Sequence, residues 1–472
     1  SDAELISVTN QIAGASYITI NECFNYFAGQ SGKFVIHNPI PPFITSDLRF
    51  SIDSRILPSY PRNGSTLYDL SGYNNNWTPL TNVVFNGQSF EFNGTTSYMQ
   101  DTVSSFNPDT APNVMEVLFK PMDLGSRQQA IFSDNWGPEY GVWINSNNTL
   151  QGVAYTSVST SNIQVGRWYY AILNVQPGAT RSSTDQTYIQ FYVNGQLIGT
   201  NNANTGNGMN DQPFSLGFDY KSNNPAAFFS GSIASARLSY GQYDQADVNF
   251  NYYGGNIVTD GLVTALDFSN LVSYESGSSS GYSLTGSVGF DLFNSPTDTS
   301  NFGGGIKCQE TDEFIALDDV TATDYVTVEV WYTRDSAGSG EDIVFNKEST
   351  WEIRDDGGNI NWAVKANNQG WFWYDSTANI SVGETVHFVL TYDGNYVKSY
   401  KNGELVQTYT YPSGGVLTSQ TSCYPKLNSR GCTRTSVSNP GNHTFYQFRI
   451  YDRALTDEEV AQNYNANINR FN

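Results

Sequence analysis

The sequence lacks the features that mark several large classes of protein. It has no run of about 18 apolar residues, so it predicts no membrane-spanning helix. Its first ten residues lack the basic and apolar segments of a signal peptide, although a signal removed from a longer precursor would leave no trace. Only 23 residues are Lys or Arg and the net charge is −22. This balance argues against binding nucleic acid, which requires a basic surface.

Cysteine and histidine are scarce as well. Four cysteines in 472 residues do not make a disulfide framework. Cys423 and Cys432 are near enough in the sequence to close a loop, and the sequence leaves open whether they do. Cys23 and Cys308 are expected to pack as small apolar groups. The three histidines belong to no zinc-binding motif, and neither a nucleophile elbow nor a phosphate-binding loop occurs.

Aromatic residues are abundant instead. They make up 14% of the chain, with 31 Tyr and 28 Phe, while charged residues also account for only 14%. Aromatic side chains favour strands, and short stretches rich in Asn, Gly, Ser and Asp separate the apolar segments. The composition predicts a folded chain that is rich in β-structure, and the length suits two large units.

A duplicated pattern supports two units. Residues 191–199, "FYVNGQLIG", match residues 399–407, "SYKNGELVQ", and each reads as two strands joined by an Asn-Gly hairpin turn. Near the ends, "ASARLSYGQYDQADVNFNYY" from Ala234 parallels "FYQFRIYDRALTDEEVAQNY" from Phe445. The spacing between matched segments stays close to 210 residues. We therefore expect a large all-β sandwich at 42–250 and a second one at 259–472.

The segments outside this repeat carry fewer signals. Thr456 to Glu459 form a capping box, which predicts a short helix through about Asn467. The short linker between the copies favours a fixed packing of the two sandwiches. Residues 1–41 have no counterpart in the second copy and read as an extended arm with two strand-like stretches. The arm either adds to a neighbour's sheet or covers its own first domain.

Three segments resemble a known family. "GSTLYDLSGYNNNWTPL" at 64–80, followed by "FNGQSFEFNGTTSYMQ", resembles the opening of laminin-G-like, concanavalin A-type lectin/glucanase jelly rolls. "GLVTALDFSNLVSY" at 261–274 is similar to the first strand of the same fold. "YDRALTDEEVAQNYNANINRF" at 451–471 is similar to the closing strand and helix of that domain in virion structural proteins of tailed bacteriophages. The resemblance implies two tandem concanavalin A-like jelly-roll sandwiches.

The second copy departs from this pattern. It has "SGSSSGYSLTGS" where the first has the Asp-Leu-Ser-Gly loop, so we expect whatever Asp69 does to be absent there. Cys308 stands at the place of core Phe92, which predicts a buried thiol.

Some members of such folds cleave glycans, so the sequence has to be searched for catalytic acids. Retaining glycosidases need two carboxylates about 5–5.5 Å apart, typically from an E-x-D-x-x-E stretch on one strand face. No such stretch occurs, and Glu116 and Glu329 are lone strand acids. We therefore expect no catalytic residues and no enzymatic activity.

A metal site is the first candidate function for the loop at 64–80. Asp69 could bind calcium together with loop carbonyls, as some members of the fold do nearby. The alternative is an Asx turn, in which Asp69 bonds the backbone before Gly72 reverses the chain. Calcium is thus the one cofactor considered. The Asp355 to Gly358 stretch is interpreted as a hairpin tip.

Sugar binding is the second candidate function, because it uses exposed aromatic rings beside polar side chains. In "NNQGWFWYDST", Trp371 and Trp373 share one face of a predicted strand, and Phe372 and Tyr374 share the other. One face must be core, and the other could meet a glycan or a packing partner. Trp77 is a further candidate. Five other tryptophans lie in alternating strands and are expected in the core: Trp143, Trp168, Trp331, Trp351 and Trp362.

These points lead to one leading hypothesis. The protein is expected to be a non-enzymatic component on the outer surface of a phage virion, a capsid decoration or head fibre with outward lectin-like domains. Its arm would bind the major capsid protein or another virion protein, and its sandwiches could bind glycans, as a homo-oligomer. Two alternatives are a tail-associated adhesin and a secreted glycan-active enzyme or its binding module.

Overall fold

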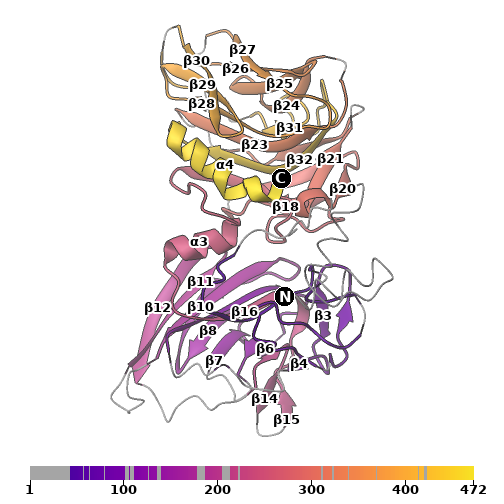
Figure 1. Cartoon of the computed structure of the whole chain (residues 1–472), viewed down its shortest axis with the longest axis vertical. Coiled ribbons are helices and arrows are strands. Elements are labelled where there is room, and N and C mark those ends of the chain that lie inside the picture. The colour runs from indigo at the N-terminus through magenta and orange to yellow at the C-terminus, as the bar shows by residue number, and fades with distance from the viewer. Residues whose placement is uncertain are drawn as a thin grey trace, which may run out of the picture. The chain divides into compact units, whose positions relative to one another are not determined.

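The computed structural model describes two compact units within residues 43–471, one over residues 44–248 and one over residues 249–471 (Figure 1). No helix in the described part of the chain combines the length and apolarity needed to cross a bilayer. Cys23 and the arm at 1–41 lie outside the described residues. Positions inside this range that are also outside the description are 57, 63, 79, 101–105, 107–110, 126, 135–139, 178–185, 205–212, 222–223, 287, 310–311, 321–323, 339, 368, 413 and 419–421.

The first unit is built from two antiparallel sheets and a separate strand pair. The larger sheet has the order β12-β11-β10-β5-β16-β3-β2, with β1 also paired to β16. The smaller sheet has the order β4-β13-β6-β7-β8-β9, and β14 pairs with β15. The larger sheet contains β1 (Leu48–Asp53), β2 (Val84–Phe85), β3 (Phe90–Asn93), β5 (Asn113–Pro121), β10 (Tyr169–Gln176), β11 (Gln186–Val193), β12 (Gln196–Asn204) and β16 (Ser230–Tyr240). The other strands are β4 (Met99–Gln100), β6 (Gln129–Ser133), β7 (Tyr140–Ile144), β8 (Thr149–Ala154), β9 (Thr156–Asn162), β13 (Ser215–Leu216), β14 (Asp219–Lys221) and β15 (Asn224–Ala226). Helix α3 (Gln245–Tyr253) spans the boundary between residues 248 and 249.

The second unit repeats the plan with two eight-stranded sheets. One has the order β20-β21-β32-β23-β28-β29-β30, with β17 paired to β32, and the other has the order β18-β19-β22-β31-β24-β25-β26-β27. The first of these contains β17 (Leu262–Asp267), β20 (Thr297–Thr299), β21 (Gly305–Cys308), β23 (Val326–Arg334), β28 (Thr385–Tyr392), β29 (Tyr396–Lys401), β30 (Glu404–Thr410) and β32 (His443–Tyr451). The second contains β18 (Ser280–Tyr282), β19 (Gly289–Phe293), β22 (Phe314–Leu317), β24 (Asp342–Lys347), β25 (Trp351–Asp356), β26 (Asn359–Val364), β27 (Phe372–Asn379) and β31 (Lys426–Leu427). The helices are η1 (Asn301–Gly303) and α4 (Asp457–Phe471).

Each unit buries one apolar core between its two sheets. In the first unit, inward residues of β5 such as Val117 join inward residues of β6 such as Phe132. In the second, Val330 of β23 and Ile353 of β25 belong to one cluster. Alternation along each strand supplies this inward face, as expected for sandwiches. The prediction of two tandem all-β sandwiches is confirmed.

Helix α4 covers the outer face of the β23-containing sheet (Figure 1). Its start is the predicted capping box: the Thr456 N–H donates to Glu459 Oε2 at 2.9 Å, and the Glu459 N–H donates to Thr456 Oγ1 at 3.3 Å. The helix continues to Phe471, beyond the predicted end at Asn467, and Phe471 stacks on Trp331 with ring centroids 4.1 Å apart. This ring contact stabilises the last turn that the capping signal alone did not predict.

Local signals in the sequence produce the predicted turns. Asn194 and Gly195 join β11 to β12 with φ values of 49° and 77°. Asn402 and Gly403 repeat this turn between β29 and β30 with φ values of 53° and 79°. Two residues with positive φ form a type I′ turn, which matches the twist of the strands. The 355–358 stretch is a hairpin tip between β25 and β26, as predicted.

The predictions for the buried tryptophans and Cys308 are confirmed. The Cys308 thiol has no exposed surface, and burial raises its pKa well above the ordinary value for a thiol. Each of the five tryptophans expected in the core is 3% exposed or less: Trp143, Trp168, Trp331, Trp351 and Trp362.

Candidate functional site

The Asp69 carboxylate serves as an acceptor for its own loop. Its Oδ1 accepts the N–H groups of Ser51 and Ser71, both at 2.9 Å. Its Oδ2 accepts the Ser71 hydroxyl at 2.6 Å and the Asn75 N–H at 3.0 Å. The bond to Ser71 closes the Asx turn, and Gly72 follows with φ of 88°.

The Asp69 carboxylate is already engaged by donors of the protein. All four groups that contact the carboxylate are hydrogen-bond donors, whereas a calcium ion requires six to eight oxygen ligands. In the described residues, no three or more His, Cys, Asp or Glu side chains gather as a metal site would require. The Asx-turn interpretation of Asp69 is confirmed, and the calcium interpretation stays a prediction.

In the second unit, a serine hydroxyl accepts the corresponding backbone hydrogen bonds. Ser283 Oγ accepts the N–H of Ala265 at 2.9 Å and the N–H of Thr285 at 3.2 Å. Ala265 is paired with Arg449 in β32, as Ser51 is paired with Arg237 in β16, so the two sites correspond. The expectation that the second copy lacks the role of Asp69 was wrong, because any acceptor at this place can close the turn.

This correspondence predicts a graded response to substitution at position 69. Asp69→Ala leaves buried N–H groups without an acceptor and is expected to lower the free energy of unfolding of the first unit by about 1–3 kcal/mol. Asp69→Ser supplies the acceptor used by Ser283 and is expected to cost less than half as much. Thermal unfolding of both variants, with and without calcium, measures this. Equal losses for Ala and Ser, or a calcium-dependent rise in wild-type Tm, would contradict the hydrogen-bonding role.

Trp77 lies in the core instead of presenting its ring to solvent. Its backbone forms a bridge with Leu67, with reciprocal N–H···O bonds of 2.9 Å. The ring is 1% exposed and stacks on Phe50 with centroids 4.4 Å apart. The prediction that Trp77 offers a ring to a sugar was wrong, because the Leu67 bridge turns the loop inward.

The two lone strand acids are both buried beside an arginine. Glu116 Oε2 lies 3.6 Å from Arg237 Nη1, and Glu329 forms an ion pair with Arg449. Both carboxylates are 1% exposed. Burial raises the pKa of Glu329, but the Arg449 charge and hydrogen bonds lower it more, to about 2. Because both acids are buried and paired with an arginine, they are unsuited to proton transfer with a substrate.

Trp373 is the described tryptophan with the most exposed ring. It is 41% exposed, while Phe372 and Tyr374, its neighbours in β27, pack against the core of the second unit. The Trp371 ring lies beside it with centroids 6.0 Å apart, and the Arg354 guanidinium carbon lies 4.3 Å from the centroid of the Trp373 ring. The predicted alternation along 371–374 is confirmed, with Trp373 directed outward.

Strand register places polar side chains on the same face as Trp373. Asn346 is paired with Glu352, Glu352 with Ala363, and Ala363 with Trp373. A second set of pairs lies two residues farther along each strand and continues this face. We call these side chains the Trp373 face: Asn346, Glu352, Ala363 and Trp373 in one row and Arg354, Asn361 and Asp375 in the other.

Charged pairs hold the outer part of the Trp373 face. Arg354 Nη1 lies 3.1 Å from Glu341 Oε1, and its Nη2 lies 3.5 Å from Asp356 Oδ2. Asp356 Oδ2 also accepts the Asn361 amide at 3.1 Å. The guanidinium is therefore held above the Trp373 ring by carboxylates on two sides.

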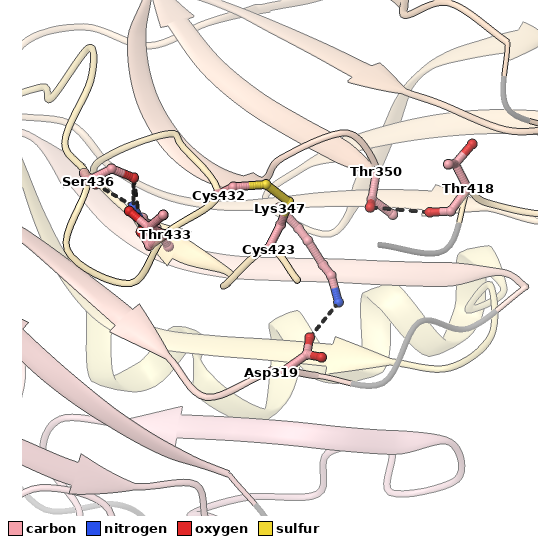
Figure 2. The surroundings of a disulfide bond; sticks show 9 residues. Asp319, Lys347, Thr350, Thr418, Cys423, Cys432, Thr433 and Ser436 are labelled. Carbon is pink, nitrogen blue, oxygen red and sulfur yellow. Dashed lines mark hydrogen bonds and ion pairs between the residues drawn. A yellow bond between two sulfur atoms is a disulfide. The ribbon is translucent and has the colours of Figure 1, made fainter. Parts of the chain in front are cut away.

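The inner end of the face contains a buried carboxyl group. Glu352 Oε1 pairs with Arg430 Nη2 at 2.7 Å, and its Oε2 accepts the Asn346 amide at 2.7 Å. Burial raises the pKa of Glu352 to about 7, against the lowering effect of Arg430. Arg430 belongs to a loop closed by a disulfide between Cys423 and Cys432 (Figure 2). The disulfide restricts the loop that supplies Arg430 to the sheet.

The Trp373 face combines an apolar ring with polar groups, and its Glu352 and Asp356 are too far apart to act as a pair of glycosidase acids. Trp373 offers an apolar ring surface, and the surrounding carboxylates and amides are ready acceptors and donors. Glu352 and Asp356 share one face of β25 but are four residues apart, about 13 Å along a strand. The carboxyl groups of inverting enzymes are about 6.5–9.5 Å apart, and those of retaining enzymes are closer. The hairpin tip at Asp355 to Gly358 could be predicted from the sequence, but the alignment of this strand with Trp373 could not.

The family model described as the concanavalin A-like lectin/glucanases superfamily matches residues 93–249 and residues 309–461. No curated protein sequence matches. One similar solved structure is the binding domain of Paraclostridial Mosquitocidal Protein 1, with 15% identity over 43% of this chain and 52% of that one and a TM-score of 0.35. The receptor-binding domain of botulinum neurotoxin D shows 14% identity over 44% and 52% and a TM-score of 0.35. The chain spans about half the length of these structures.

Proposed function

Since the chain belongs to the concanavalin A-like lectin/glucanases superfamily, we propose that it is a non-enzymatic, sugar-binding protein whose second unit binds glycans on the Trp373 face. The observation that carries this proposal is the exposed Trp373 ring, with Trp371 beside it and charged and amide groups around it. A sugar ring has an apolar face that can pack on an aromatic ring and a rim of hydroxyl groups that can bond with the polar neighbours.

Substitution of Trp373 tests this proposal directly. Trp373→Ala removes the ring and is expected to weaken glycan binding by about tenfold to hundredfold, equivalent to ~1.4–2.8 kcal/mol. A glycan array identifies ligands of the wild-type chain, and calorimetry then measures the Kd for the variant. The matched control is Tyr396→Ala, because Tyr396 is 46% exposed but lies on β29, in the other sheet of the unit. Equal affinities for wild type and Trp373→Ala would refute this site.

We further propose that the protein is a structural component on the outer surface of a tailed-phage virion, as a capsid decoration or head fibre. The likeness of residues 451–471 to the closing strand and helix of virion proteins supports this role, as does the arm at 1–41, which the second half does not repeat. In this role the arm binds the major capsid protein or another virion protein. The sandwiches then face outward, where glycans are encountered.

Deletion of residues 1–41 tests the virion role. We expect the truncated chain to keep its glycan binding, because the Trp373 face lies in the second unit, but to be absent from purified particles. Quantitative mass spectrometry of particles assembled with either chain measures incorporation. Normal incorporation of the truncated chain would contradict attachment through the arm, whatever its glycan affinity.

A further inference from the structure

The groups that surround the exposed Trp373 ring are predominantly acidic. Glu341 and Asp356 have side chains that are 52% and 43% exposed, and Asp375 is exposed as well. The guanidinium of Arg354 lies among them, with a side chain that is only 17% exposed. Three carboxylates against one cation give this part of the Trp373 face a negative charge, which attracts cations and repels anions.

The cation in this cluster is already engaged. Arg354 contacts Glu341 and Asp356 through its two terminal nitrogens, and its guanidinium lies over one face of the Trp373 ring. An anionic sugar would have to displace these carboxylates to reach the guanidinium, and it would meet Asp375 in the same row as Arg354. The arrangement therefore disfavours uronic, sialic and sulfated sugars.

The exposed polar atoms are mainly hydrogen-bond acceptors. An ionised carboxylate accepts at about four positions and donates none, and Asp356 uses only part of this capacity in its bond to Asn361. A matching ligand must bring donors.

We propose that the Trp373 face selects glycans that contain amino sugars with a free, protonated amino group. An ammonium group brings three donors and a positive charge, which matches the acceptors and the charge of Glu341, Asp356 and Asp375. The sugar ring packs on Trp373 while the ammonium group lies against the carboxylates. This inference rests on the proposed glycan-binding function of the same face.

The experiment compares three oligosaccharides of equal length: a glucosamine oligomer, its N-acetylated form and a galacturonate oligomer. Calorimetry with the full chain at mildly acidic pH, where the amino groups of the sugar are protonated, and at low salt is expected to give the lowest Kd for the glucosamine oligomer. We expect a Kd at least fivefold higher for the N-acetylated form, and binding of the galacturonate oligomer at least tenfold weaker than that form. Raising the salt concentration should weaken glucosamine binding, because salt screens exposed charges.

Charge-neutral variants show which carboxylates cause the preference for the glucosamine oligomer. Asp356→Asn and Asp375→Asn should each reduce the preference for glucosamine over the N-acetylated form by severalfold, and far-UV circular dichroism checks that they fold. The matched control is Glu404→Gln, an exposed acid at the start of β30 in the other sheet. Tighter binding of the N-acetylated or galacturonate oligomer would overturn the amino-sugar inference and leave glycan binding intact. Failure of all three oligosaccharides and of a wider glycan array to bind through Trp373 would overturn both.

Discussion

Replacing Arg449 by methionine is expected to lower the free energy of unfolding of the second unit by about 3–5 kcal/mol. Arg449 and Glu329 face each other across β32 and β23, and their side chains are 3% and 1% exposed. Without the guanidinium, the Glu329 carboxylate stays buried with the Asn463 amide, which donates to its Oε2 at 2.7 Å, and with His387. Removing one member of a buried ion pair is costly because the other charge remains without compensation.

Hydrogen exchange in the full chain measures this loss unit by unit. Amides of β23 and β32 should exchange about two to three and a half orders of magnitude faster, whereas those of β5 and β16 should keep their rates. Lys398→Met is the matched control, because Lys398 Nζ pairs with Asp457 at 2.7 Å on the surface, with side chains 30% and 48% exposed. It is expected to cost less than about 1 kcal/mol. A loss for Arg449→Met as small as that of the control would show that the pair contributes little.

The same pair predicts a dependence on pH. The pKa of Glu329 is about 2 in the folded chain, below its ordinary value of 4.5. A carboxyl with a lowered pKa stabilises the fold above the unfolded value, and this contribution is lost as pH falls from about 5 to 2. The stability of the second unit should therefore fall more steeply over this range in wild type than in Glu329→Gln. Equal slopes of stability against pH in wild type and Glu329→Gln would contradict the lowered pKa of Glu329.

Features that depend on neighbouring residues in the chain could be predicted from the sequence. The Asn-Gly hairpins, the capping box at Thr456 and the alternation of 371–374 each follow from contacts within a few residues. The Trp373 face was harder to predict, because its prediction requires the register of four strands. β-bulges between Ile343 and Phe345, and between Asn359 and Asn361, shift that register. No local pattern in the sequence shows where such a bulge will form.

The loop at 64–80 shows a second limit of sequence comparison. The second copy lacks the Asp-Leu-Ser-Gly loop, which suggested that the role of Asp69 is lost there. The structure requires only an acceptor at this place, and both side chains provide one. Likewise, the Cys423–Cys432 bridge depends on a distance that the loop sequence alone left open.

Truncation of Trp77 is expected to be the most destabilising change in the first unit. Trp77 is 1% exposed, so Trp77→Ala leaves a cavity in place of its ring. Such a truncation costs about 3–5 kcal/mol. Phe50 loses its stacked partner at 4.4 Å, and Phe132 loses an edge contact at 6.3 Å. The unfolding transition of the first unit should therefore move to much lower denaturant concentration.

Trp77→Ala and Trp373→Ala together separate a core tryptophan from a binding one. Trp77→Ala should accelerate exchange in β1 and β6 of the first unit and leave the glycan Kd unchanged, because the Trp373 face lies in the second unit. Trp373→Ala should change the free energy of unfolding by no more than about 1 kcal/mol, because Trp373 is partly exposed. The same substitution should weaken glycan binding. If Trp77→Ala instead kept its exchange rates and lost glycan affinity, the loop at 64–80 would be a sugar site, and the assignment of Trp77 to the core would be wrong.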